Sequence, residues 1–387
     1  MSTSTASDSG SSQQSIAILD DYAEIAATHF SHIPNLKIDN YSSTLNPKKD
    51  ADLQALIERL KPYPIISCMR ERTPFPSTLL TQLPNLRLLL TTGIRNASID
   101  LATCKAQSIT VAGTTGARPS RYDSDGNPLH WHEGPKEDAQ TQTQGPSLPP
   151  PPGYDSTTQH GWSLLLSLTS RIPTDTQRLL ETSGSWQSGF SIPLGGKTLG
   201  VLGLGKLGTS FARIARFAFG MNVVAWSENL TQDKADAAAQ KAGLESGVFT
   251  VVGSKEELFR RADVLSIHYV LSDRSRGIVG ARELGLMKKS AVLVNTARGP
   301  LIDEDALFEV LDKGGIRGAA LDVWWEEPLP GDSRWRSTKW GQDGRSELVL
   351  SPHMGYVNEG TMNSWYREQA ADVEKWLQGE EVGVRLA

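Results

Sequence analysis

Short apolar runs alternate with helix-like segments along the first part of the chain, from Ser15 onward. The predicted strands are Ile16–Leu19, Leu36–Ile38, Ile65–Cys68, Leu86–Thr91 and Ile109–Val111, and the predicted helices are Ala23–Phe30, Asp52–Leu60 and Ile99–Gln107. Strands that alternate with helices form a parallel sheet with helices on both faces. The pattern therefore predicts a first α/β unit, and the first turn of this unit has no glycine fingerprint.

The alternation of strands and helices resumes after Trp186 and predicts a second unit. Its expected strands are Thr198–Leu202, Met221–Trp226, Thr250–Val252, Val264–His268, Ala291–Asn295, Ala319–Val323 and Leu348–Ser351. Six or seven strands alternating with helices form a complete doubly wound domain. A last helix, predicted over Glu359–Leu377, follows the final strand and could cross back to cover the first unit.

A glycine-rich turn opens the second unit. Gly203, Gly205 and Gly208 form G-x-G-x-x-G between the strand Thr198–Leu202 and a predicted helix over Lys206–Phe219. In such a turn the first glycine permits the tight bend, the second lets the backbone approach a pyrophosphate, and the third allows close helix–strand packing. The helix N-terminus would receive the anion. Because a second strand follows in register, the segment predicts a dinucleotide site and not a bare turn.

The pattern breaks between residues 117 and 156, where Pro, Gly, Gln, Asp and Thr dominate. We expect a flexible insertion there, and an inert surface loop is favoured over a lid. The pair His130 and His132 lacks a third ligand at metal spacing, so no metal is expected. The Ser/Thr-rich residues 1–14 are predicted to form a disordered tail.

Composition excludes several classes of function. The 387-residue chain carries a net charge of −5 without a basic cluster, so no nucleic-acid partner is expected. No apolar run reaches membrane-spanning length. The two cysteines, Cys68 and Cys104, fit a reducing compartment. These features predict a soluble, cytoplasmic protein.

Three polar residues follow strands of the second unit. Arg298 comes after Ala291–Asn295, Glu327 after Ala319–Val323, and His353 within the segment after Leu348. Taken singly, Arg298 could pair with a nearby carboxylate, and His353 could cap a satisfied core. Ligands of open α/β sheets bind beyond the carboxyl ends of strands, so a cation, an acid and an imidazole at this edge together indicate a catalytic set.

Four motifs resemble the cofactor half of the D-isomer-specific 2-hydroxyacid dehydrogenase family. They are G-L-G-K-L-G at Gly203–Gly208, V-N-T-A-R-G-P-L-I-D-E-D-A-L at Val294–Leu307, A-L-D-V-W-W-E-E-P at Ala320–Pro328 and S-P-H-M-G-Y at Ser351–Tyr356. The spacings also match, with 327 − 298 = 29 and 353 − 327 = 26 residues between the three candidates. The resemblance covers nearly the whole chain outside the tail and the insertion.

The resemblance implies an α/β fold of two doubly wound parallel-sheet domains. A Rossmann dinucleotide-binding domain would span residues 157–356, and a smaller flavodoxin-like substrate domain would span residues 15–116, completed by 357–387. The helix over Thr158–Leu168 is too apolar for a surface helix. We therefore expect it to pack between domains or against a second subunit, and the family implies a homodimer.

The implied activity is an oxidoreductase that transfers hydride between a nicotinamide cofactor and a small D-2-hydroxy acid or its 2-oxo form. Arg298 would hold the substrate carboxylate and carbonyl oxygen with its fork of donors. His353 would be the acid/base, because free imidazole titrates near the working pH. Glu327 would fix its tautomer and favour its protonated form. Formate-specific relatives carry an amide in place of Glu327, which argues against formate oxidation.

The resemblance also implies further contacts. Asp322 matches the ligand of the nicotinamide carboxamide, and His268 and Tyr269 match the loop under the nicotinamide ribose, although a core histidine is an equal reading of His268. The implied cofactor-binding residues are Gly203, Gly205, Lys206, Leu207, Gly208, Ser227, Glu228, His268, Thr296, Ala297 and Asp322. The implied substrate-binding residues are Gly93, Ile94 and Arg95, within the Thr92–Asn96 loop whose N–H groups would receive the carboxylate, together with Arg298. Arg70 could assist them, but pairing with Glu71 is favoured.

Two alternatives follow from the sequence, one for the coenzyme and one for the function. NAD-dependent relatives carry an acid at the tip of the second strand, where this chain has Ser227 followed by Glu228. A carboxylate repels a 2′-phosphate, so NAD is favoured and NADP remains possible. The alternative function is a non-catalytic, NAD(H)-sensing binding protein like the family's corepressors.

Overall fold

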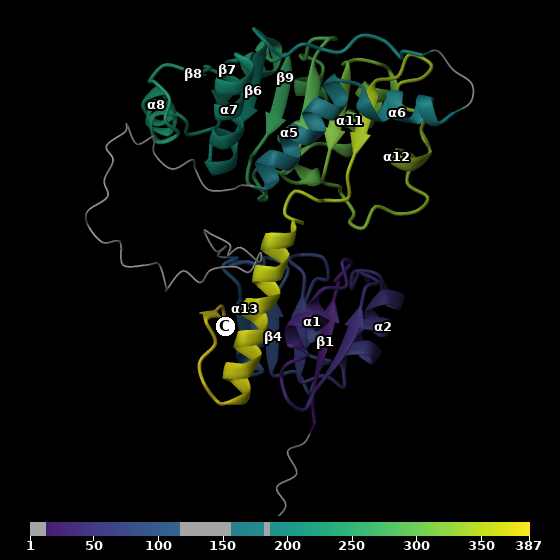
Figure 1. Cartoon of the computed structure of the whole chain (residues 1–387), viewed down its shortest axis with the longest axis vertical. Coiled ribbons are helices and arrows are strands. Elements are labelled where there is room, and N and C mark those ends of the chain that lie inside the picture. Colours follow the sequence, from purple (N-terminus) through teal and green to yellow (C-terminus); the bar gives the residue numbers. More distant parts are fainter. Residues whose placement is uncertain (1–12, 117–155, 182–185) are drawn as a thin grey trace, which may run out of the picture. The chain divides into compact units, whose positions relative to one another are not determined.

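The computed structural model describes residues 13–116, 156–181 and 186–387, which form two compact units (Figure 1). The first unit contains the described residues up to 116 together with Glu359–Ala387. The second contains the described residues from 156 to Asn358. The tail through residue 12 and the insertion through residue 155 lie outside the described residues, as do His130 and His132.

The first unit is a six-stranded sheet in the order β13-β5-β4-β3-β1-β2. Apart from antiparallel β13, this is the flavodoxin-like order 2-1-3-4-5 that the resemblance implies. Its elements are β1 (Gln14–Leu19), α1 (Ala26–Phe30), β2 (Leu36–Tyr41), α2 (Asp50–Leu60), β3 (Ile65–Cys68), α3 (Ser77–Leu80), β4 (Leu88–Thr91), α4 (Leu101–Ala106), β5 (Thr110–Gly113), α13 (Glu359–Leu377) and β13 (Val384–Arg385). The predicted strands are all present.

The C-terminal segment completes this first unit. Helix α13 packs against α1, and β13 pairs with β5 at the sheet edge. Within the helix, Gln369 is fully buried and accepts a hydrogen bond from Ser67 of β3 at 2.7 Å. The prediction that the last helix covers the first unit is therefore confirmed, whereas β13 was not predicted.

The second unit is a seven-stranded, all-parallel sheet in the order β12-β11-β10-β9-β6-β7-β8. This is the Rossmann order with one added strand. Its elements are α5 (Ser156–Thr169), α6 (Ile172–Leu180), β6 (Thr198–Leu202), α7 (Lys206–Phe219), β7 (Asn222–Trp226), α8 (Gln232–Lys241), β8 (Phe249–Val251), α9 (Lys255–Arg261), β9 (Val264–Ile267), α10 (Ala281–Leu284), β10 (Val292–Asn295), α11 (Glu304–Asp312), β11 (Gly318–Leu321), α12 (Arg334–Ser337) and β12 (Glu347–Leu350).

Some predicted boundaries are wrong, for local reasons. Strand β1 begins at Gln14, inside the predicted tail, because its ladder with β2 starts there. Helix α1 begins at Ala26 and not at Ala23, since Glu24 has a left-handed φ of +55° and Asp21 accepts a hydrogen bond from the Ala26 N–H. Helix α5 begins at Ser156, inside the predicted insertion.

Helix α5 is buried within its own unit. Its apolar side chains Trp162, Leu165 and Leu168 are buried in the core with α7 and strands β10 to β12. Trp162 stacks on Phe211 and Phe219 of α7, with ring centroids 4.6 and 4.7 Å away. The apolarity that suggested a contact with another domain or subunit is therefore accounted for by this packing.

Candidate active site

The carboxyl ends of seven parallel strands meet at one edge of the second unit's sheet. The turns that leave β6, β7, β9, β10, β11 and β12 at this edge carry the predicted residues, namely Gly203–Gly208, Ser227–Glu228, His268, Thr296–Arg298, Asp322–Glu327 and His353. The sheet therefore brings residues that lie far apart in the sequence to one rim, where open α/β sheets bind ligands.

The glycine turn between β6 and α7 has the geometry that its sequence predicts. Gly203 has a φ of +98°, and a Cβ on Gly208 would lie 2.2 Å from the Gly203 carbonyl oxygen, so both positions require glycine. A Cβ on Gly205 would meet no atom within 4 Å, so the turn is open on that side. Lys206 and Leu207 begin α7, whose N-cap Gly205 offers no side chain to the N–H groups of the first turn. These N–H groups form an anion-binding end.

Ser227 and Glu228 follow β7 at the same edge. Glu228 is exposed, and its N–H lies 3.4 Å from the hydroxyl of Tyr269. The cations that are near in sequence contact backbone carbonyls: Lys234 donates to Asn229, and Arg213 donates to Ala242.

His268 lies at the end of β9, beside the glycine turn. The Cβ position of Gly203 is 3.0 Å from the His268 carbonyl group. The ring is hydrogen-bonded to the Ser266 hydroxyl at 2.8 Å and packs against Phe211. Burial lowers the pKa of His268 to about 4. The ring therefore lies in the wall behind the glycine turn.

The lowered pKa of His268 predicts how stability depends on pH. Between its ordinary value of 6.5 and about 4, the unfolded chain binds a proton that the folded chain does not. The free energy of unfolding should therefore fall as pH drops through this window, by up to about 3 kcal/mol. His268→Gln removes the titration and should flatten this part of the curve in urea unfolding measured from pH 7 to pH 4. An unchanged slope would contradict the assignment.

Arg298 follows β10 on a loop that Asn295 braces. The Asn295 side chain accepts from the Ala297 N–H at 3.0 Å and donates to the Arg298 carbonyl at 3.0 Å. Arg298 Nη1 donates to the Ala297 carbonyl at 2.7 Å, and Thr296 is buried. The Ala297 N–H is therefore bonded inside the loop.

Glu327 and His353 form a hydrogen-bonded pair. His353 Nδ1 donates to Glu327 Oε2 at 2.6 Å, and Glu327 Oε1 accepts from the Trp324 N–H at 2.9 Å. Both side chains are largely buried, at 15% and 20% exposure. With Nδ1 bonded to the carboxylate, Nε2 is the nitrogen left for another partner. His353 has a left-handed φ of +58°, an unusual conformation for a non-glycine residue.

Asp322 is fully buried at the end of β11. Oδ1 lies within hydrogen-bond distance of His160 Nε2, the Ser351 hydroxyl and the Met354 N–H, and Oδ2 accepts from the Gly355 N–H. Burial raises the pKa of Asp322, but these hydrogen bonds lower it by more, so that it lies below its ordinary value. The expected carboxamide ligand is thus also bonded to the segment that carries His353.

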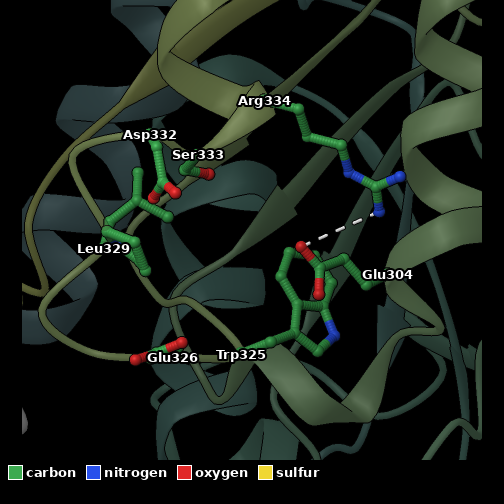
Figure 2. Close-up of a pocket in the computed structure, with 8 residues that line it drawn as sticks. Glu304, Trp325, Glu326, Leu329, Asp332, Ser333 and Arg334 are labelled. Carbon is green, nitrogen blue, oxygen red and sulfur yellow. Dashed lines mark ion pairs between the residues drawn. The ribbon is translucent and has the colours of Figure 1, made fainter.

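An aromatic cluster lies behind the Glu327 loop. Trp335 is buried and stacks on Trp325, and Trp324, Trp340 and Phe308 pack around it. A cavity of about 460 Å³ opens over Trp325 (Figure 2). It is lined by Glu304, Trp325, Glu326, Leu329, Pro330, Asp332, Ser333 and Arg334, and Arg334 pairs with Glu304. Trp325 and Glu326 directly precede Glu327 in the sequence, so the cavity lies beside the loop that carries Glu327.

The predicted substrate loop of the first unit is held by Thr114. The Gly93 N–H donates to the Thr114 hydroxyl at 2.8 Å, and the Gly93 carbonyl accepts from the Thr114 N–H. The Gly93 N–H is therefore bonded within the first unit in this structure. Ile94 and Arg95 are exposed, and the buried Asn96 bonds to Thr91 and to the Arg70 carbonyl.

Arg70 lies against this loop. Its Nε is 3.5 Å from a Glu71 carboxylate oxygen, as favoured from the sequence. Its Nη1 also lies 2.6 Å from the Cβ position of Gly93, so the guanidinium covers the glycine. This contact could not be predicted, because it joins residues 23 positions apart in the turns that follow the neighbouring strands β3 and β4.

Two further observations concern metal sites and membrane-spanning helices. Among the described residues, no group of three or more His, Cys, Asp and Glu side chains could hold a metal ion. No helix within the described ranges is long and apolar enough to cross a membrane.

Comparisons with known proteins agree with this geometry. Residues 162–355 match the model of the D-isomer-specific 2-hydroxyacid dehydrogenase NAD-binding domain. The chain is 36% identical over 217 residues to a D-3-phosphoglycerate dehydrogenase of Methanocaldococcus jannaschii, covering 56% of this chain and 38% of the relative. It is 32% identical over 234 residues to a glyoxylate reductase of Aeropyrum pernix, covering 58% and 64%.

A solved structure resembles almost the whole chain. The phosphoglycerate oxidoreductase of Vibrio cholerae is 29% identical, with a TM-score of 0.73, and the match covers 95% of this chain and 99% of that one. The chain spans between about a third and two thirds of the length of the curated relatives named above. The family model covers half of the chain, and the chain belongs to the D-isomer-specific 2-hydroxyacid dehydrogenase family.

Proposed function

We propose that this protein is an NAD-dependent oxidoreductase that interconverts a small D-2-hydroxy acid and its 2-oxo acid. The observation that carries the proposal is the His353–Glu327 pair, which lies at the same sheet edge as the glycine turn. The names of the relatives, a glyoxylate reductase and a D-3-phosphoglycerate dehydrogenase, support this class of substrate.

The glycine turn fits a dinucleotide. The open side of Gly205 leaves room for a pyrophosphate, and the first-turn N–H groups of α7 would bind it. When bound, the nicotinamide supplies or accepts the hydride. Lys206, Leu207 and the backbone near Gly203 and Gly208 would line the phosphates, and the turn after β9 would lie beside the nicotinamide ribose.

NAD is the proposed coenzyme, with NADP as the alternative. Exposed Glu228 would repel a 2′-phosphate and could accept from a free ribose hydroxyl, as could Ser227. Lys234 and Arg213 already donate to carbonyl groups of their own neighbourhood. A cation-lined pocket for a 2′-phosphate is therefore not formed by these two side chains.

His353 would move the proton. Glu327 fixes the imidazole with Nδ1–H toward the carboxylate, so Nε2 carries the proton that goes to the substrate oxygen in reduction and returns in oxidation. The second bond of Glu327, to the Trp324 N–H, prevents the carboxylate from turning away. This arrangement is the base–orienter geometry expected of a general acid/base.

Arg298 would anchor the acid. A guanidinium keeps its charge and offers donors in a planar fork, which suits a carboxylate next to a carbonyl oxygen. Asn295 holds the backbone on both sides of Arg298, which gives the side chain a fixed base. Gly93, Ile94 and Arg95 remain proposed substrate-binding residues beside Arg298.

The test is NADH consumption with a panel of 2-oxo acids, from glyoxylate and hydroxypyruvate to branched and aromatic acids, repeated with NADPH. The proposal predicts turnover of at least one acid and a higher kcat/KM with NADH. Tight coenzyme binding without turnover of any acid would count against an enzyme. Faster reaction with NADPH would overturn the coenzyme assignment.

Gly299 controls the distance between the Arg298 loop and the Glu327 loop. A Cβ on Gly299 would lie 2.3 Å from the Trp324 carbonyl carbon, so Gly299→Ala must push the two loops apart. We expect kcat to fall by about 100-fold with little change in NADH affinity. Gly331→Ala is the matched control, because its Cβ would meet no atom within 4 Å, and it should keep wild-type kcat. Equal kcat in both variants would refute the argument.

A homodimer is the proposed assembly, and α6 is its candidate surface. None of the residues of α6 is buried, and its Leu179 and Leu180 are 61% and 82% exposed. Trp186 and Phe190 nearby are also exposed. Such an apolar face is typical of a subunit contact. Sedimentation should give a dimer for the wild type and a monomer for Leu179→Asp/Leu180→Asp, and a wild-type monomer would exclude the assembly.

A further inference from the structure

His160 is a partly buried residue of helix α5, one position before the buried Gly161 and Trp162. Its Nε2 lies 3.0 Å from Asp322 Oδ1 and 2.9 Å from the Ser351 hydroxyl, and Ser351 donates to the same carboxylate oxygen. Although Ser, His and Asp meet here, both partners contact the same imidazole nitrogen. A nucleophilic triad requires them on opposite nitrogens, so this group is not one.

Asp322 links His160 to the segment that carries His353 through hydrogen bonds. It accepts from the Met354 N–H at 2.7 Å and from the Gly355 N–H at 2.9 Å, which directly follow the histidine. Ser351, two residues before His353, donates to the same carboxylate. Three bonds to one aspartate therefore bracket the residue with the left-handed backbone.

Helix α5 contacts the segment a second time. The Thr157 hydroxyl donates to the Gly355 carbonyl at 3.2 Å, and the Cβ position of Gly355 lies 3.3 Å from the Thr157 methyl group. Ser351 is also fixed through its carbonyl, which accepts from the Trp324 indole at 3.1 Å. The first turn of α5 and the turn after β11 together enclose residues 351–355.

A fully buried carboxylate is costly unless both of its oxygens accept hydrogen bonds that offset the lost hydration. Of the four donors to Asp322, the two N–H groups belong to the His353 segment itself, and Ser351 lies in the same segment. His160 is the donor from outside this segment, so it ties the carboxylate to the helix. Without it, Asp322 and the segment could shift together.

We propose that His160 is a positioning residue for the reaction, which holds Asp322 and Ser351 so that His353 keeps the backbone conformation that presents its ring to Glu327. This inference rests on the proposed function and adds two residues to it, His160 and Ser351, as supports. It also gives Asp322, the expected carboxamide ligand, a second role as the anchor of the segment that carries His353. Removing the support should weaken the His353–Glu327 geometry and leave the glycine turn after β6 in place.

The experiment compares His160→Phe, His160→Gln and the surface control Gln159→Ala, which lies exposed on the same helix. Glutamine can place an amide donor near the position of Nε2. For each protein, kcat and KM for the best 2-oxo acid, the Kd for NADH and the melting temperature are measured. His160→Phe should lower kcat by about 10- to 100-fold with a much smaller change in NADH Kd, since the pyrophosphate turn does not involve Asp322, and His160→Gln should restore most of the kcat.

A second measurement does not depend on turnover. The short hydrogen bond from His353 Nδ1 to Glu327 should give a far-downfield proton resonance, assigned by its absence in His353→Gln. It should be lost or broadened in His160→Phe and kept in His160→Gln and Gln159→Ala. If the wild type shows the resonance but reduces no acid, the proposed function fails while the positioning role is still tested by this signal.

Two outcomes would overturn the inference. The first is a His160→Phe protein with wild-type kcat and an unchanged resonance. The second is parallel loss of kcat, NADH affinity and melting temperature that His160→Gln does not restore, since this would assign His160 to general packing of α5. Combining His160→Phe with Ser351→Ala should add little further loss of kcat, because both act through Asp322. Fully additive effects would also contradict the inference.

Discussion

His353→Gln is expected to lower kcat for 2-oxo acid reduction by about 10³-fold, within the range that general acid/base groups contribute. In the native site Nδ1 is bonded to Glu327, so Nε2 carries the proton that the developing alkoxide needs. A glutamine fills similar space and can donate a hydrogen bond, but it cannot give up a proton at neutral pH. Water would then have to supply it.

The control measurement for this variant is its affinity for NADH. His353 follows β12, whereas the glycine turn follows β6, and three strands separate them in the sheet. NADH affinity, measured by protein-to-nicotinamide fluorescence transfer, should therefore stay at the wild-type value. A variant that keeps more than a tenth of the wild-type kcat would remove His353 from the acid/base role.

Arg298→Ala is expected to reduce kcat/KM for the 2-oxo acid by about 10³-fold, because it removes both the carboxylate anchor and the positive charge beside the carbonyl oxygen. The loss should appear in KM as well as in kcat, unlike that of His353→Gln. Arg298→Lys keeps the charge but not the planar fork, so its activity should fall between those of the alanine variant and the wild type.

Two results would separate anchoring from a structural role of Arg298. Added guanidinium ion should partly restore the alanine variant, since the two bonds from Asn295 to the loop backbone do not involve the Arg298 side chain and remain in the variant. The melting temperature should change little. An unchanged KM in Arg298→Ala, with kcat also preserved, would mean that another group binds the acid.

The parts of the fold that follow local rules could be predicted from the sequence. The bounds of β6 and α7 are as predicted, because an apolar run, a glycine fingerprint and helical periodicity succeed one another there. Strand β3 and helix α13 also have their predicted bounds. The wrong predictions are at ends of elements that are set by a side-chain hydrogen bond. For example, Asp21 accepts from the Ala26 N–H, and this bond sets the start of α1.

Long-range contacts could not be predicted in the same way. The sequence marks α5 as too apolar for the surface but does not say what covers it, and the answer is its own unit's α7 and strands β10 to β12. β13 is a two-residue strand that exists because the edge of β5 was open to it.

The candidate site shows the same division. Arg298, Glu327 and His353 are recognisable because each follows a strand and all three match family motifs. The residues that support these three could not be recognised from the sequence. Asn295 was predicted only as the end of a strand, and His160 only as one position of a helix. His160 and Asp322 are 162 positions apart in sequence, so only the folded sheet reveals their contact. The one sequence feature that could have indicated this contact was a histidine beside the apolar positions of the predicted helix.

The most direct test of the proposed function follows the hydride itself. NADH carrying deuterium at C4, in each of its two stereoisomers, is incubated with the protein and the best 2-oxo acid, and the product is analysed by mass spectrometry and chiral chromatography. We predict that one stereoisomer places a single deuterium at C2 of a D-2-hydroxy acid and that the other does not. Product without deuterium from either stereoisomer, or product of the L configuration, would contradict the account.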